Sequence, residues 1–198
     1  MRNPAPCLGL CLCLWAAASL AGCDRPPPLG GGLRPDGGGA KSLSLGDGAS
    51  ASLAAQDFLA KAVGADLYQI EAAKVAALKA RSSDIKAFAK AMSEEHASSR
   101  ALLNYAASGP GPSAPVPTKP TEQQQSMLHL LNREKPKDFD RTFIEQQVQI
   151  HQETLALVDA YAKSGQVASI RAVAHGLAPD LRQDLDKAQA IENAMDKR

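Results

Sequence analysis

Asp84 to Ala107, DIKAFAKAMSEEHASSRALLNYAA, is the stretch that decides the fold of this chain. At about 100° per residue its apolar side chains gather on one side of a helix, and His96 falls among them. The pattern therefore predicts an amphipathic helix whose buried face carries a histidine. That face consists of Ile85, Phe88, Ala89, Met92, His96, Ser99, Leu103 and Ala106.

Three other segments show the same helical period, and no segment alternates as a β-strand does. They run from Leu53 to the break at Arg81, from Phe139 to Lys163, and from about Gln166 onward. The short break at Arg81, where Ser82 or Ser83 can cap the next helix, makes the first two helices antiparallel. Four long helices in roughly 145 residues can bury one core, which predicts a single all-α domain.

The first helix is expected to turn its larger apolar side chains inward and to point Lys61, Gln69 and Lys79 elsewhere. Glu71 lies inside the expected arc and Lys74 just beside it. Glu71 is therefore either the i,i+3 partner of Lys74 or an inward carboxylate. The expected inward stripe is Leu59, Ala60, Val63, Leu67, Ile70, Ala77 and Leu78.

A proline-rich segment, Gly109 to Pro120, separates the two pairs of long helices and cannot itself be helical. Thr121 and Gln124 then form a capping box for a short helix, Glu122 to about Arg133. One hairpin, a long crossover that carries a short extra helix, and a second hairpin predict a ferritin-like four-helix bundle. Further along, Asp138 is expected to cap the third long helix, Gly165 to end it, and Pro179 to kink or restart the last one.

The N-terminal residues read as a lipoprotein signal peptide, residues 1–22. Arg2 and a short apolar run precede Leu20-Ala21-Gly22-Cys23, which resembles the lipobox of bacterial lipoproteins. Cys23 would then be the lipidated first residue of the mature chain. Residues 23–51, rich in Gly and Pro, are expected to be a flexible tether, and residues 52–198 the bundle.

Composition excludes several classes of function. All four cysteines lie at or before Cys23, so the mature body can have no disulfide, no thiolate nucleophile and no cysteine-ligated zinc. Removing residues 1–22 leaves 21 basic and 21 acidic residues, a net charge of zero. Such a surface predicts no nucleic-acid partner. The expected partners are the membrane, through the N-terminal lipid, and other envelope proteins.

Four polar residues, Glu71, His96, His151 and Asp184, interrupt the apolar stripes, one on each long helix. Two interpretations stay open for them. They form a hydrogen-bonded network, with His96 paired to Glu71 and His151 to Asp184, or they bind a mononuclear metal ion, for which Zn, Fe or Mn would be suitable. A ferritin-type di-iron site is excluded, because neither histidine follows a glutamate in a Glu-x-x-His motif. His129 and His175 are expected at the surface.

Four segments resemble the DUF4142 family of bacterial envelope proteins, described as exported or outer-membrane proteins with a ferritin-like helical body. The resemblance covers nearly all of the body, but this chain departs from the family pattern where Asp184 replaces a usual histidine and Phe143 a common tyrosine. A further departure is Ala178, inserted between Leu177 and Pro179. The segments are QDFLAKAVGADLYQIEAAKVAALKA, SDIKAFAKAMSEEH, KDFDRTFIEQQVQIHQETLALVDAYA and LAPDLRQDLDKA.

The resemblance implies a fold and a location, not an activity. No GxSxG, HExxH or glycine-rich phosphate loop is present, so an enzyme would need an unfamiliar site. The sequence therefore predicts a lipid-anchored helical module of the bacterial envelope, on either membrane and facing the periplasm or the outside. Its expected role is binding or structural and related to stress. The alternative is a metal-binding bundle.

Overall fold

The body of the chain is built from helices alone. The computed structural model describes residues 45–109 and 115–197, and places side chains from residue 54 onward. The predicted signal peptide, residues 1–22, and Cys23 lie outside the described residues. The described elements are α1 Leu45–Lys79, α2 Ser83–Ala107, α3 Glu122–Arg133, α4 Phe139–Ser164 and α5 Ala168–Asp196. α1 thus begins inside the segment that the sequence assigns to the tether.

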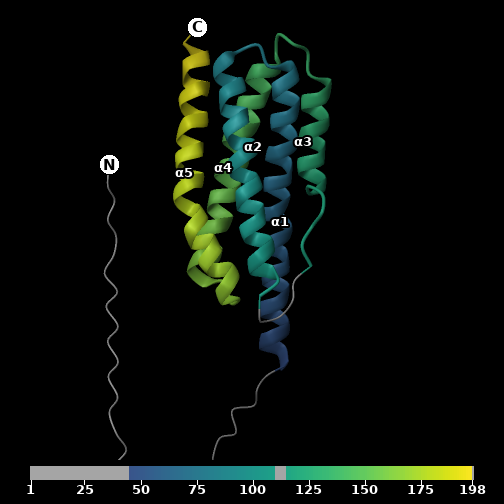
Figure 1. The fold of residues 1–198 in the computed structure, drawn as a ribbon, viewed down its shortest axis with the longest axis vertical. Helices are drawn as coiled ribbons and strands as arrows, with labels where there is room; N and C mark the ends of the chain where they lie inside the picture. The colour runs from purple at the N-terminus through teal and green to yellow at the C-terminus, as the bar shows by residue number, and fades with distance from the viewer. Residues whose placement is uncertain (1–44, 110–114, 198) are drawn as a thin grey trace, which may run out of the picture. The chain divides into compact units, whose positions relative to one another are not determined.

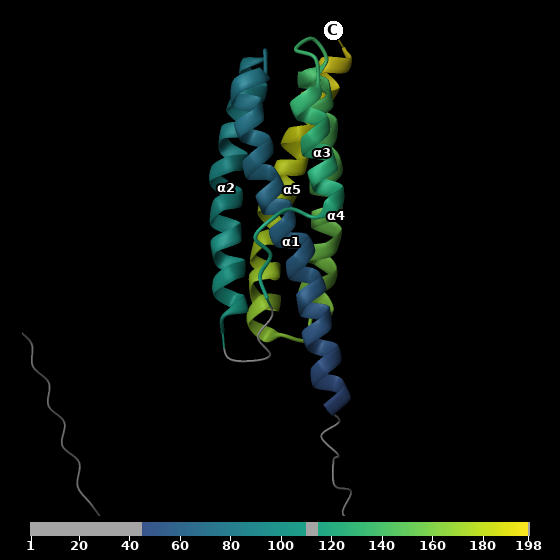
Figure 2. The same ribbon diagram turned by 90° about the vertical axis from the view of Figure 1, so that its right-hand side faces the viewer.

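Two antiparallel hairpins, α1–α2 and α4–α5, pack side by side (Figure 1). α1 contacts α4 and α2 contacts α5, so the four long helices surround a common core. α3 packs on α1 and α4 (Figure 2), and it lies on the opposite side of the bundle from α5 (Figure 1). α2 and α4 run in the same direction, which confirms the predicted ferritin-like bundle with a long crossover. None of the described helices has an apolar stretch long enough to span a bilayer.

Two predicted caps are present. The Ser82 hydroxyl accepts hydrogen bonds from the backbone N–H groups of Asp84 and Ile85, at 3.2 and 3.4 Å. Thr121 and Gln124 form the capping box of α3, each side chain accepting from the other residue's backbone N–H. These contacts satisfy N–H groups that a helix start leaves without partners. They fix where α2 and α3 begin.

Three helix signals act differently from the prediction. Asp138 precedes α4, but its side chain makes no capping hydrogen bond. Gly165 ends α4 with a φ of −59°, outside the left-handed region that usually favours glycine. Glycine is required there because a Cβ would run into the ring of Tyr161. α5 continues through Pro179 and does not restart.

The buried face of α1 is only partly the predicted one, since Leu59 and Val63 are buried as expected and other members of the stripe are not. Leu78, expected inward, is 87% exposed, whereas Asp66 and Gln69 are buried. Leu67 and Ile70 are only partly buried. The true face lies about a third of a turn from the expected one, and alanine dominates it. Its apolar members include Ala55, Phe58, Leu59, Ala62, Val63, Ala65, Tyr68, Ala72, Ala73 and Ala76.

Close helix packing explains the alanine face of α1. α1 contacts α2, α3 and α4 at once, and small side chains allow these backbones to approach. Gly64 lies at a close contact with α3, because a Cβ there would lie 2.7 Å from the Gln124 side-chain oxygen. The number of neighbouring helices, not side-chain size, therefore selects the buried face.

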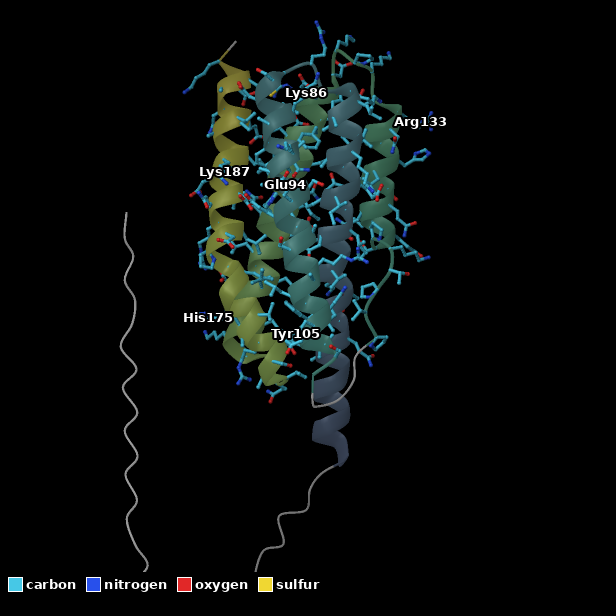
Figure 3. The ribbon with its side chains drawn as sticks, in the orientation of Figure 1. Lys86, Glu94, Tyr105, Arg133, His175 and Lys187 are labelled. Atoms are coloured by element: carbon cyan, nitrogen blue, oxygen red, sulfur yellow. The ribbon has the colours of Figure 1, made fainter. Side chains whose placement is uncertain are left out.

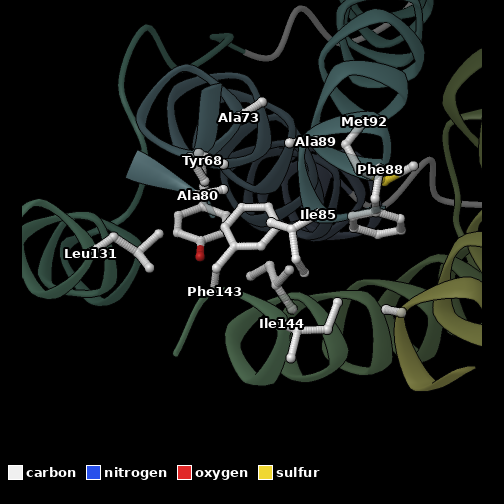
Figure 4. Close-up of a cluster of buried hydrophobic side chains, with 14 of the residues drawn as sticks. Tyr68, Ala73, Ala80, Ile85, Phe88, Ala89, Met92, Leu131, Phe143 and Ile144 are labelled. Atoms are coloured by element: carbon white, nitrogen blue, oxygen red, sulfur yellow. The ribbon is translucent and has the colours of Figure 1, made fainter. Parts of the chain in front are cut away.

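The apolar core consists of two clusters. The first cluster includes Phe58 and Leu103 and lies toward the N-terminal part of α1. The second includes Tyr68, Met92 and Phe143. Figure 4 shows side chains from α1, α2, α3 and α4 meeting in this second cluster. The boundary between the two clusters crosses all four long helices, and it is where the polar residues lie.

Candidate metal centre

A layer of buried polar side chains lies at the boundary between the two apolar clusters. Each long helix supplies one ionisable member: Asp66 from α1, His96 from α2, His151 from α4 and Asp184 from α5. All four are at most 4% exposed. Burial of ionisable groups is costly unless they are paired, hydrogen-bonded or bound to a metal. The contacts of each residue show which of these applies.

His96 is oriented by a carboxylate. Its Nδ1 lies 2.8 Å from Oδ1 of Asp66, whose other oxygen accepts the Ser99 hydroxyl at 3.0 Å. Burial raises the pKa of Asp66, and the hydrogen bond from His96 opposes that rise. When Asp66 is ionised and the His96 ring is neutral, the His96 proton sits on Nδ1 and Nε2 carries a lone pair. A carboxylate behind a histidine in this way is the usual support of a metal-binding imidazole.

His151 is oriented by the backbone. Its Nδ1 lies 2.8 Å from the carbonyl oxygen of Gln147, so Nδ1 donates and Nε2 is the unprotonated nitrogen. Burial, followed by repulsion from His96, lowers the pKa of His151 to about 4. The ring is therefore neutral at neutral pH. Neutral imidazole is the form that binds metal ions.

The two free imidazole nitrogens face each other. Nε2 of His96 lies 3.4 Å from Nε2 of His151. Two lone pairs cannot bond to each other, so this contact needs a cation between them, either a proton or a metal ion. The distance is longer than the roughly 2.7–3.2 Å of most N–H hydrogen bonds, and it equals that of the Ser82 cap at Ile85. It agrees with two nitrogens that each lie about 2.0–2.1 Å from one tetrahedral ion. The geometry can therefore hold either a metal ion or a shared proton.

Asp184 supplies the third group. Ligand atoms of His96, His151 and Asp184 all lie within 4.8 Å of one another. Lys187 donates to Oδ1 of Asp184 at 3.0 Å, which holds the carboxylate in place. Glu95 lies beside it, and burial, together with the hydrogen bond and charge of Asp184, raises the pKa of Glu95. The centre therefore combines two imidazoles, one buried carboxylate and a second carboxyl group at its edge.

The centre is accessible from the surface between α2 and α5. A pocket of about 310 Å³ is lined by Glu95, His96 and Asp184 together with leucine side chains of both helices. Figure 3 shows Glu94 on α2 and Lys187 on α5 at the same level of the bundle. Glu94 also lines this pocket. The pocket therefore reaches His96 and Asp184, whereas His151 lies behind them and does not line it.

Three of the four residues predicted as a cluster come together, and Glu71 does not. Glu71 is exposed, and its Oε1 pairs with Nζ of Lys74 at 2.7 Å. The expected pair of His96 with Glu71 is therefore wrong, and Asp66 takes that position. Because Glu71 and Asp66 are five residues apart on one helix, rotation of the α1 face replaces one carboxylate by the other.

The sequence reasoning missed the buried polar residues on the true face of α1. Asp66 and Gln69 lie among alanines. If the buried face of α1 had been predicted from its alanines rather than from its larger apolar residues, these two residues would have been expected inside. His151 also differs from the prediction, since it donates to the Gln147 carbonyl rather than to Asp184. The helical period did not single out Glu95, because this residue lies at the edge of the apolar stripe of α2.

The other two histidines are at the surface, as predicted. His129 on α3 and His175 on α5 are both exposed. Figure 3 shows His175 projecting from the outer side of α5. His129 and His175 are therefore suitable control positions for substitutions of the two buried histidines.

Fold and cluster together define a ferritin-like helical bundle with a histidine and carboxylate centre. Residues 41–191 match the family model of DUF4142, a domain of unknown function. The match covers most of the chain, so the protein belongs to this family. Comparison with curated proteins and with solved structures finds no match.

Proposed function

We propose that this protein binds one divalent transition-metal ion through His96, His151 and Asp184. The observation that carries the proposal is the pair of imidazole Nε2 atoms, 3.4 Å apart, with each Nδ1 held by another acceptor. When both rings are neutral and Asp66 is ionised, each ring presents a lone pair to the same point.

The donor set indicates the class of metal. Imidazole nitrogens suit Zn, Fe and other first-row transition metals, whereas Mg²⁺ and Ca²⁺ prefer oxygen alone. Two histidines and one carboxylate would leave at least one position of a tetrahedral ion free. Asp184 also lines a pocket that opens to the surface. The function that follows is reversible binding of Zn²⁺, Fe²⁺ or Mn²⁺ by an envelope protein.

Titration of the full chain with metal tests this function. After removal of metal by a chelator, the protein should bind one Zn²⁺ per chain in calorimetry. His96→Leu and His151→Leu should each abolish saturable binding, because each removes an imidazole ligand. His129→Leu and His175→Leu are the controls and should bind as the wild type does. Absence of saturable binding by the wild type, or equal losses in the controls, would refute the proposal.

We also propose that a lipid on Cys23 holds the bundle at the bacterial membrane. Support comes from the sequence, where Leu20 to Cys23 follow a short apolar run. Replacing Cys23 with Ser should leave an unprocessed precursor that takes up no labelled lipid, because the thiol is the acceptor. A mature, soluble form of unchanged size from Cys23→Ser would contradict lipidation.

A further inference from the structure

The pocket between α2 and α5 is acidic at one end and apolar at the other. Its lining changes from Glu95 to Leu102 along α2, and from Leu177 to Asp184 along α5. Because α2 and α5 run in opposite directions, the two carboxyl groups lie level with each other, and so do the two leucines. At a rise of about 1.5 Å per residue, the acidic and apolar ends are roughly 10 Å apart.

Three leucines form the apolar end of the pocket. Leu102 is 51% exposed, whereas Leu181 is 7% exposed, so the apolar wall extends from the surface into the core. Leu177 is partly buried and packs against the first apolar cluster. Contact between this wall and an aliphatic chain would remove apolar surface from water, which is favourable.

The acidic end has more negative than positive charge. Lys187 pairs with Oδ1 of Asp184 at 3.0 Å, but no lysine or arginine of the described residues pairs with Glu95 or Asp180. The pocket lining itself contains no basic residue. Asp180 precedes Asp184 by one helical turn, a spacing at which like charges repel. A cation placed here would therefore be stabilised.

A deeply buried carboxylate forms the floor of this end. Asp184 is 3% exposed and yet lines the pocket. Apart from Lys187, the hydrogen-bonding contact of its side chain among the described residues is with the carboxyl of Glu95. Two carboxyl groups in contact need a proton or a cation between them. The floor of the pocket thus lacks a permanent N–H donor that an incoming cation can supply.

A primary ammonium group on a short aliphatic chain matches both ends of the pocket. An ammonium has three N–H donors and no acceptor, which suits several separate carboxyl groups. The lining contains no aromatic ring, so it lacks the faces that recognise quaternary ammonium ions. A volume of about 310 Å³ is at the small end of the range for ligand pockets, which favours a small molecule.

We propose that the pocket between α2 and α5 binds a small aliphatic amine, with its ammonium group at Glu95 and Asp180 and its chain along the three leucines. This site goes beyond the metal-binding function. Neither Glu95 nor Asp180 is among the three proposed metal ligands, and the amine requires no metal. The two sites share only the side chains of Asp184 and His96 as a common wall.

Titration of the full chain with n-hexylamine tests the site, with chelator present and chemical shifts of the labelled protein as the readout. Hexylamine should shift signals of α2 and α5 saturably. Hexanol and hexanoate have the same chain with a neutral or negative head, and they should give no saturable shift at the same concentrations. Butylamine is two methylenes shorter and should bind roughly tenfold more weakly, because each buried methylene contributes up to about fourfold.

Substitutions test each end of the pocket separately. Glu95→Gln together with Asp180→Asn should weaken hexylamine binding more than about tenfold, since each exposed charge pair contributes up to about fivefold. Asp186→Asn is the control, because Asp186 is an exposed acidic residue of α5 outside the pocket.

Leu102→Ser should weaken binding about fivefold by removing part of the apolar wall. Leu130→Ser on α3 is the matched control, because Leu130 is also 51% exposed. Both controls should bind hexylamine as the wild type does. Circular dichroism checks that each variant keeps its helices.

The outcomes distinguish the amine site from the metal site. Binding that is weakened in the pocket variants and kept in the controls supports the amine site, whether or not the wild type binds Zn²⁺. The amine site is overturned if the wild type does not bind hexylamine saturably, if hexanol binds equally well, or if the controls lose as much as the pocket variants. A wild type that binds hexylamine but no Zn²⁺ refutes only the metal-binding function.

Discussion

Without metal, His151→Leu should melt at or above the temperature of the wild type, and with saturating Zn²⁺ the order should reverse. His151 is 1% exposed and neutral when buried, and Leu is an apolar side chain of similar volume. The metal-free wild type also holds two facing imidazole nitrogens that a leucine removes.

Zn²⁺ should stabilise only the chains that keep the site. A ligand at about 100 times its Kd adds about 2.7 kcal/mol to the free energy of unfolding. For a body of this size that corresponds to a rise in Tm of roughly 5–10 °C. His151→Leu should show no rise, and His175→Leu, which changes an exposed histidine, should show the full rise. Circular dichroism is the appropriate measurement, because the predicted mature chain has no tryptophan.

The network interpretation makes the opposite prediction for His151→Leu. If the two imidazoles share a proton and no metal, removal of one leaves buried groups without partners and costs about 1–3 kcal/mol with or without chelator. A loss of that size in metal-free His151→Leu, together with no effect of Zn²⁺ on the wild type, would therefore favour the network and reject the metal centre.

Asp66→Ala should weaken both the fold and the metal site. Asp66 accepts from His96 and Ser99 in the core, at 2.8 and 3.0 Å. Its loss leaves the buried His96 Nδ1–H without an acceptor, which costs about 1–3 kcal/mol in the free energy of unfolding. Because the His96 ring also loses its orientation, metal affinity should fall about 10- to 100-fold. Urea unfolding and metal titration measure the two effects.

Two other substitutions calibrate the Asp66 result. Asp66→Asn keeps an oxygen that can accept from His96, so most of the stability should remain. Metal affinity should still fall, since the amide lacks the negative charge. Glu71→Ala removes an exposed carboxylate from the same helix and should change stability by less than about 0.5 kcal/mol. If Glu71→Ala proves as damaging as Asp66→Ala, the assignment of the buried face of α1 is wrong.

Periodicity was a reliable guide where one face of a helix is clearly more apolar than the rest. On α2 it placed His96 correctly in the buried stripe, between Met92 and Leu103. On α4 and α5 it placed His151 and Asp184 inward. It could not identify the partners of these residues, because hydrogen bonds between helices depend on which side chains the packing brings to the same level.

The sequence alone determined the number and order of the helices, the crossover and the caps at Ser82 and Thr121. These features depend on local patterns: the helical period, side chains that bond to nearby N–H groups, and prolines that exclude helix. Local information also places three of the residues at the centre on buried faces. The sequence resemblance to DUF4142, which the family match confirms, adds the ferritin-like fold.

Only the tertiary structure decided which face of α1 is buried, and therefore that Asp66 and Gln69, rather than Glu71, lie at the centre. α1 carries apolar side chains on several sides, so the pattern of larger residues does not select one face. The choice comes from close contact with α2, α3 and α4, which requires alanine and Gly64 at the contacts and leaves Leu78 exposed. Packing of this kind joins residues far apart in the chain, and no local period records it.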